Sequence, residues 1–364
     1  MSDEHAFAPN WISSPGETIA DLLRAKELSV SQFARLVDCS EAFANELLFG
    51  VASIDGATAT KLKSALGGST SFWMAREAQY RGNIDRLHTV QDDDKKAWIR
   101  AFPLKDMVQN GWTEPAKTLQ EKYEVVLRYF NVPTVQAWRK KYRSELSVVS
   151  FRTSPSIPSR PESVVAWLRQ GEIQGNQIEC SRWNKENFIS ALTKIRSLTR
   201  TKRPADFIPI LRELCASCGV ALAIVRTPEG CRASGATRFL SSEKALIQLS
   251  FRFLSDDQFW FTFFHEAGHL ILHSEDALFL EDGSETTSDE ERQANEFAAE
   301  TLIPREYDNL LSQIPLQAKE VLRFARKIGV SPGIVVGQLQ HRRRLTHNWL
   351  NGLKRRYVRE DIPI

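Results

Sequence analysis

Two histidines and a glutamate in the segment His265-Glu266-Ala267-Gly268-His269 have the spacing of a metal-dependent hydrolase. On a helix, residues four positions apart lie on one face, so His265 and His269 can direct both imidazoles at one ion. Glu266 follows the first histidine, where it can act as a general base toward water. The spacing therefore predicts peptide-bond hydrolysis at a Zn²⁺ site, with Mn²⁺ as the alternative metal.

Apolar residues surround this motif on both sides. Phe261-Thr262-Phe263-Phe264 precedes it and Leu270-Ile271-Leu272 follows it. Such a helix is expected to be buried, and buried histidine and glutamate side chains need partners, for which a metal ion is suited. The alternative is a surface helix with coincidental histidines, but a surface helix would carry more polar residues.

A third protein ligand is expected from the downstream segment 289–302. Glu291 and Asn295 are four positions apart there, so Glu291 is predicted as the ligand and Asn295 as a hydrogen-bond partner of a ligating histidine. Glu290 and Glu296 remain alternatives, each rotated by about 100° from its neighbour on a helix. An acidic helix start stabilised by the helix dipole is the non-functional interpretation, and it suits Glu290 better than Glu291.

Two further signals near the motif are interpreted as structural. His273 lies four positions beyond His269 but does not share a face with His265, so it is expected to be a histidine at the helix end. Cys215 and Cys218 form a lone CxxC without a second pair, and they are expected to be small buried residues on a helix.

The chain has 364 residues, which predicts two or three domains around these segments. Residues 219–225 and 245–249 are expected to be short strands, with turns at 230–235. Helical periodicity predicts the following helices: 188–198, 207–218, 257–273 and 289–302. Prolines and serines at 150–161 indicate a linker or an extended crossing segment.

The N-terminal part is predicted to be helical throughout. Apolar residues recur at helical spacing across 16–80. Ser29 and Ser31 are candidate N-caps of one short helix and Ser40 of the next, and about three residues join these two helices. Such a pair predicts a helix-turn-helix. Residues 90–145 are again helical, and they are rich in aromatic and basic side chains.

The motif and its surroundings resemble the ImmA/IrrE metallopeptidase family. Three stretches carry the resemblance: 263–269, 291–298 and Leu302-Ile303-Pro304; the segments 235–239, 255–261 and 328–339 are also similar. The resemblance covers about residues 185–342 and implies a zincin-like fold with Glu291 as the acidic ligand and Glu266 as the base. It further implies a protein substrate, because family members cleave or displace repressors in stress and mobile-element control.

Residues 16–85, including Phe72-Trp73-Met74, resemble HigA-like antitoxin and repressor domains of the XRE type. The resemblance implies DNA contact through the second helix, where Glu41, Phe43 and Asn45 would face the major groove. This helix has no Arg or Lys, and its glutamates would repel phosphates. DNA binding is therefore in doubt, and protein contact or homodimerisation is the alternative.

Charge is distributed unevenly along the chain. Residues 1–80 hold 6 Lys/Arg and 10 Asp/Glu, whereas residues 321–364 hold 10 Lys/Arg and 2 Asp/Glu. The basic end, with 342–344 and 354–356, could bind nucleic acid, an acidic protein or the acidic part of another subunit, or it could be a solvated helix end. Five cysteines, no leader pattern and no long apolar run predict a cytoplasmic protein with reduced thiols and no membrane contact.

These features predict a mostly helical α+β chain with a helix-turn-helix bundle and a zincin-like domain that contains a small sheet. The expected divisions are 1–85 (HigA-like), 86–150 (helical), 151–184 (linker or crossing segment), 185–342 (metallopeptidase) and 343–364 (basic tail). The expected function is a zinc endopeptidase acting on a repressor-type regulator. The alternative is a DNA-binding regulator or antitoxin that uses the metal domain for sensing without proteolysis.

Overall fold

The computed structural model describes residues 14–87, 92–143, 159–273, 278–281 and 288–363. The chain divides into two compact units. The first comprises Met1–Phe102 and Gly111–Arg143, and the second comprises Pro103–Asn110 and Ser144–Ile364.

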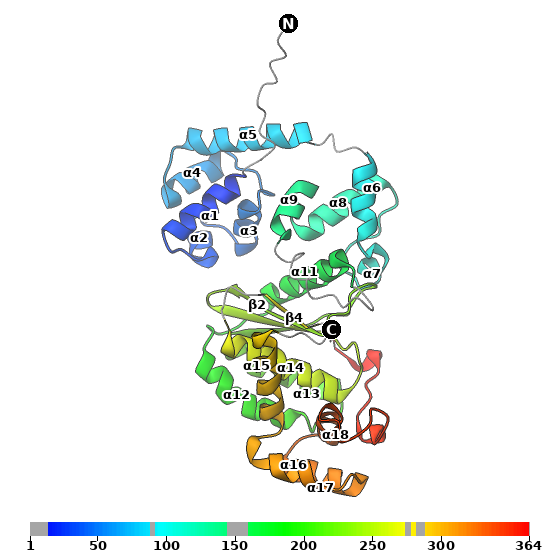
Figure 1. Cartoon of the computed structure of the whole chain (residues 1–364). Helices are drawn as coiled ribbons and strands as arrows, with labels where there is room; N and C mark the ends of the chain where they lie inside the picture. Colours follow the sequence, from blue (N-terminus) through cyan, green and yellow to red (C-terminus); the bar gives the residue numbers. More distant parts are fainter. Residues whose placement is uncertain (1–13, 88–91, 144–158, 274–277, 282–287, 364) are drawn as a thin grey trace. The chain divides into compact units, whose positions relative to one another are not determined.

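The first unit is helical in its described residues (Figure 1). Its helices are α1 (Pro15–Ala25), α2 (Val30–Leu36), α3 (Glu41–Leu48), α4 (Gly56–Leu66), α5 (Thr70–Leu87), α6 (Asp92–Ala101), α8 (Leu119–Phe130) and α9 (Val135–Lys141). Of the candidate caps, Ser29 caps α2 and Ser40 caps α3, whereas Ser31 lies inside α2. Each serine accepts a hydrogen bond from an otherwise unpaired N–H of the first turn.

Two apolar clusters hold this unit together. One is built around Phe33, Leu62 and Trp73 from the first five helices. The other consists of aromatic rings of α6, α8 and α9 in edge contacts, including Trp98 with Trp138 at 5.7 Å between ring centroids. Most of the aromatic residues that made 90–145 distinctive in the sequence are therefore core residues, whereas Trp112 is only partly buried.

The second unit contains the sheet and the remaining helices (Figure 1). Its helices are α7 (Leu104–Gln109), α11 (Pro161–Gln177), α12 (Lys185–Leu198), α13 (Pro204–Ala216), α14 (Asp256–Leu272), α15 (Asp289–Leu302), η1 (Arg305–Tyr307), α16 (Asp308–Gln313), α17 (Ala318–Ile328), α18 (Pro332–His341), η2 (Asn351–Leu353) and η3 (Arg359–Asp361). Its strands are β1 (Val220–Ile224), β2 (Gly235–Ser241), β3 (Lys244–Leu249) and β4 (Phe279–Glu281).

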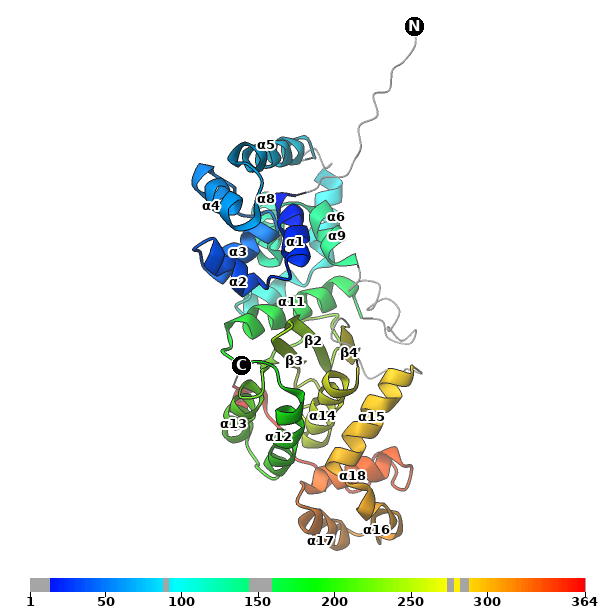
Figure 2. The same cartoon turned by 90° about the vertical axis from the view of Figure 1, so that its left-hand side faces the viewer.

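The four strands form one mixed sheet in the order β1-β3-β2-β4. β1 pairs with β3 in parallel, whereas β2 is antiparallel to both β3 and β4. Helix α11 covers one face, and α13 and α14 lie on the other (Figures 1 and 2). The predicted strands at 219–225 and 245–249 are confirmed as β1 and β3, whereas β2 and β4 were not predicted.

Residues 159–184 of the expected linker or crossing segment include a helix. Helix α11 occupies 161–177, and its Trp167 side chain is buried. Trp167 Nε1 donates to the carbonyl of Val225 at 3.0 Å, and Gln248 Nε2 donates to the Trp167 carbonyl at 2.7 Å. Packing against the sheet stabilises a helix that Gly171 and Gly175 make difficult to predict from propensity. Residues 151–158 lie outside the described residues.

The expected basic tail, 343–364, also differs. Leu345, Tyr357 and Ile362 are buried in the same core as the sheet. Lys354 Nζ forms an ion pair with Asp257 Oδ2 at 2.6 Å, and both side chains are largely buried. Part of the positive charge thus neutralises an acid at the start of α14.

The chain is mostly helical with a small mixed sheet, so the α+β prediction is confirmed at that level. Within the described ranges, every helix is too short or too polar to cross a bilayer.

Candidate metal centre

Helix α14 carries the two histidines of the motif through the interior of the second unit. It is apolar on several faces, and Trp260, Phe263 and Phe264 are fully buried. It packs against β2 and β3 on one side and against α15 and α18 on others. This surrounding protein explains why His265, Glu266 and His269 are also inaccessible, at 1%, 0% and 2% exposure.

His265, His269 and Glu291 converge at one point. His265 Nε2 lies 3.0 Å from His269 Nε2 and 3.1 Å from Glu291 Oε2. Glu291 Oε1 lies 3.6 Å from His269 Nε2. One nitrogen or oxygen from each side chain lies within 4.8 Å of the others, and all three residues are buried. The three side chains predicted as ligands thus form one compact set.

The close approach of α15 to α14 depends on Gly268. A Cβ at this position would lie 3.1 Å from Phe297 Cδ1 and 3.3 Å from Ala294 Cα. Ala294 is itself fully buried between the two helices. Small residues on both helices therefore bring the backbones together, which places Glu291 beside the histidines.

Hydrogen bonds hold both imidazoles by their remaining nitrogens. His265 Nδ1 lies 3.0 Å from Asn295 Oδ1. His269 Nδ1 lies 3.0 Å from His273 Nδ1, and His273 Nε2 lies 3.4 Å from Gln293 Oε1. Donation from each Nδ1 leaves Nε2 available as a ligand atom.

His273 is the C-cap residue of α14, which confirms the expected helix-end histidine, and it also contacts His269. Because His273 was compared only with His265, its contact with His269, one turn earlier on the helix, was not predicted. An i, i+4 spacing from the second histidine was the signal in the sequence that could have indicated this contact. Phe279 of β4 adds a further contact, because its ring stacks on His269 with 4.1 Å between centroids.

Glu266 lies beside the start of β2. A Cβ on Gly235 would lie 2.4 Å from Glu266 Oε1 and 2.6 Å from Thr262 Cγ2, so only glycine leaves space for the carboxylate there. Thr237 Oγ1 donates to the Glu266 carbonyl at 3.3 Å. The strand therefore fixes the place of the glutamate, a contribution that the sequence interpretation did not include.

The protein environment sets the charges of the site. Burial raises the pKa of Glu291, but its contacts with the His265 and His269 imidazoles outweigh burial and hold this pKa well below its usual range. The pKa of His269 falls to about 4, mainly because of burial. The neighbouring His265 and His273 also lower this pKa, whereas the contact with Glu291 raises it. A neutral imidazole and an ionised carboxylate are the protonation states that bind a metal ion.

The alternative acidic ligands are oriented differently. Glu290 and Glu296 are exposed on α15, and Glu296 accepts a hydrogen bond from Arg292 Nη1 at 3.3 Å. Asn295 is also exposed, although its Oδ1 reaches His265. Two imidazoles and one buried carboxylate form a donor set that suits a divalent transition metal.

The residues predicted to contact DNA lie on α3 in the first unit. Glu41 is exposed and Asn45 is partly exposed, whereas Phe43 packs against the apolar cluster of that unit. The connection between α2 and α3 spans residues 37–40. The three residues therefore do not form one exposed face.

Comparison with known proteins relates part of the chain to a peptidase family. Residues 226–340 match the family model of peptidase M78, described as the IrrE N-terminal-like domain. The matched range contains the motif on α14 and the ligand-bearing α15, and it supports the resemblance to the ImmA/IrrE family. No curated protein matches the chain.

Proposed function

We propose that this protein is a zinc-dependent endopeptidase that cleaves a regulatory protein of the repressor type. The observation that carries the proposal is the convergence of His265, His269 and Glu291 beside the buried Glu266. The match of this region to a peptidase family supports hydrolysis over a purely structural metal site.

His265, His269 and Glu291 would hold the metal. Bound zinc supplies Lewis acidity, which activates water and polarises a peptide carbonyl near neutral pH. Glu266 takes the proton of the attacking water and passes it to the leaving amine. Asn295 and His273 keep the two imidazoles in the tautomer that carries its proton on Nδ1. Gly235, which has no side chain, leaves space for the Glu266 carboxylate.

The first unit would recognise the regulator. The α2–α3 pair supports a HigA-like unit, and the acidic Glu41 together with the inward Phe43 favours contact with protein over contact with DNA. A repressor with a related helical domain is a substrate that such a unit could bind.

Glu266→Gln tests the proposal. The zinc-loaded wild type is incubated with a peptide library derived from a whole proteome, and new termini are identified by mass spectrometry. Wild type should generate specific termini, and Glu266→Gln should lose about 100-fold or more of the rate while retaining zinc. The matched control Glu296→Gln makes the same change on the exposed face of α15 and should keep full activity.

Absence of new termini with zinc-loaded wild type would contradict the proposal. Equal cleavage by Glu266→Gln would contradict it as well, because a contaminating protease would then be the source.

A further inference from the structure

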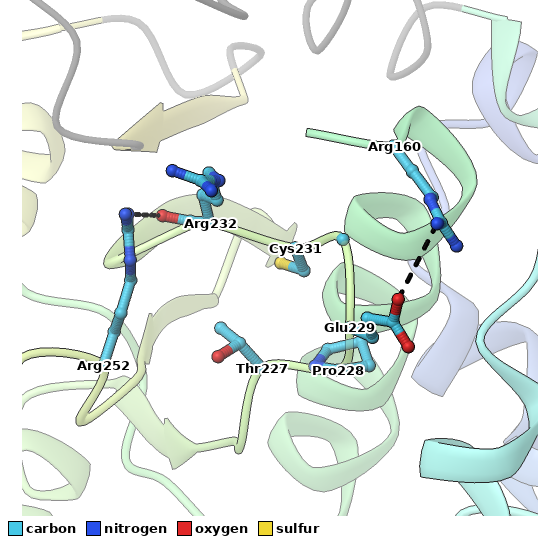
Figure 3. Close-up of a pocket in the computed structure, with 8 residues that line it drawn as sticks. Arg160, Thr227, Pro228, Glu229, Cys231, Arg232 and Arg252 are labelled. Atoms are coloured by element: carbon cyan, nitrogen blue, oxygen red, sulfur yellow. Dashed lines mark hydrogen bonds and ion pairs between the residues drawn. The ribbon is translucent and has the colours of Figure 1, made fainter. Parts of the chain in front are cut away.

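A cavity in the second unit has features of an anion-binding site (Figure 3). Its volume is about 490 Å³, and we call it the arginine pocket. It is lined by Arg160, Thr227, Pro228, Glu229, Gly230, Cys231, Arg232 and Arg252. Three arginines against one glutamate give this lining an excess of positive charge.

The three arginines differ in the hydrogen bonds and ion pairs that they form. Arg252 Nη1 donates to the Arg232 carbonyl, which holds these two residues together on one side of the pocket. Arg160 forms an exposed ion pair with Glu229 at 3.7 Å, a contact of little strength. Among the described residues, no hydrogen bond or ion pair occupies the guanidinium of Arg232.

The backbone of the pocket is built closely around these charges. Gly230 has a φ of 81°, and a Cβ there would lie 2.9 Å from Arg160 Cδ. The Arg160 N–H donates to the Gly230 carbonyl at 2.8 Å, and the Cys231 N–H donates to the Pro228 carbonyl at 3.0 Å. Figure 3 shows Arg160 and Glu229 on one side and Arg232 and Arg252 on the other. The turn thus holds the arginines on opposite sides of one opening.

The arginine pocket lies close along the chain to Gly235, the residue that borders Glu266. Arg232 precedes Gly235 by three residues, so their Cα atoms are at most about 11 Å apart. Gly235 in turn is the residue whose Cβ would touch Glu266 Oε1. The intervening Ser234 has a buried hydroxyl without a hydrogen-bond partner among the described residues, and it lines a small cavity together with Thr262 of α14.

The composition of the lining restricts the ligand. It has no aromatic ring on which a nucleobase could stack, and its guanidinium groups match the planar geometry of carboxylates. An extended peptide advances about 3.3 Å per residue, so about three of its residues would span the separation between Arg232 and Gly235.

We propose that the arginine pocket binds an acidic side chain of the peptide substrate, through Arg232 and with Arg160 and Arg252 beside it. The proposal rests on the proposed peptidase function and adds a specificity to it. Arg232 here is a specificity residue, and it takes no part in the proton transfers of Glu266.

Binding of peptide pools tests this specificity independently of cleavage. The zinc-loaded Glu266→Gln protein is titrated with fluorescent peptide pools that are identical except for Glu or Gln at one fixed position, scanned along the peptide. At one position, about three residues from the centre, the Glu pool should bind about 10-fold more tightly. Adding Arg232→Gln should reduce that ratio to about 1, and Arg232→Glu should invert it in favour of a Lys pool.

The matched control is Arg226→Gln, which removes the same charge from an exposed arginine that does not line the arginine pocket. It should leave the Glu-to-Gln ratio unchanged. In proteins with Glu266 restored, Arg232→Gln should raise KM for acidic peptides and leave kcat unchanged.

Equal affinity for Glu and Gln pools at every position would overturn the inference. So would an equal loss of the preference in the Arg226 and Arg232 variants, because the effect would then be general electrostatics. If wild type cleaves peptides without an acidic preference, only the specificity is wrong. If it cleaves none while acidic pools still bind through Arg232, the peptidase proposal fails and the pocket is an acidic-peptide site alone.

Discussion

His273 contacts His269 through its Nδ1 atom, which lies 3.0 Å from Nδ1 of His269. The contact fixes the His269 ring in the orientation that presents Nε2 to Glu291 and His265. It also extends the site to Gln293 on α15, so both helices contribute to the support of the imidazoles.

Replacement of His273 by Phe should weaken zinc binding about 10- to 100-fold, because loss of the partner frees the His269 ring. Competition with a chromophoric zinc chelator measures the affinity. His347→Phe changes an exposed histidine of the same unit and should have no effect. Equal affinities of wild type and His273→Phe would show that the contact does not support the ligand.

Gly235→Ala should lower kcat about 100-fold while zinc remains bound. The added methyl group would meet Glu266 Oε1 at 2.4 Å and must displace the carboxylate, whereas no metal ligand is touched. The readouts are zinc content and cleavage rate. Gly352→Ala, with open space around its Cβ, is the control, and a fully active Gly235→Ala would refute the assigned place of Glu266.

Metal-free protein should lose stability as the pH falls from about 6.5 to about 4. The pKa of His269 is about 4 in the folded chain and 6.5 in its unfolded reference, so only the unfolded state gains a proton in this window. The shift of about 2.5 units corresponds to roughly 3 kcal/mol. Denaturant titrations at each pH measure it, and His269→Asn should flatten the slope. A slope that is as steep in His269→Asn would assign the effect to other groups.

Lys354→Met should destabilise the second unit by about 3–5 kcal/mol, because it leaves the buried Asp257 carboxylate without its cation. Thermal unfolding and denaturant titration report the loss. Adding Asp257→Asn should recover a large part of it, since the uncompensated charge is then gone. Arg356→Met, an exposed neighbour, should change stability by less than about 0.5 kcal/mol, and a similar loss there would argue against the ion pair.

The sequence predicted the core of the site because its geometry is mainly local. His265, Glu266 and His269 share one helix, and the spacing of Glu291 and Asn295 is set by another, so helical periodicity was sufficient. The crossing of α14 and α15 could not be read from periodicity, although Gly268 and Ala294 allow it. Gly235 was missed for the same reason, since its contact with Glu266 depends on how the sheet lies against α14.

The elements that were missed depend on packing between distant segments. Helix α11 contains two glycines that lower helix propensity, and one of them, Gly171, is required because Gln248 occupies the adjacent space. Strand β4 is only three residues long and forms where β2 offers an unpaired edge. From charge alone, the C-terminal basic residues were expected to form one group. In the structure, the Lys354 side chain is largely buried, whereas Arg356 is exposed.

The hydrogen bonds between Asp256 and Arg355 have a consequence for the order of events during synthesis. The Arg355 N–H donates to Asp256 Oδ1 at 2.9 Å, and the Asp256 N–H donates to the Arg355 carbonyl at 3.1 Å. At translation rates of about 5–20 residues per second, Arg355 follows the last ligand, Glu291, by several seconds. A nascent chain therefore carries all three proposed ligands before the start of α14 is secured, and the proposed peptidase activity should arise only late in translation.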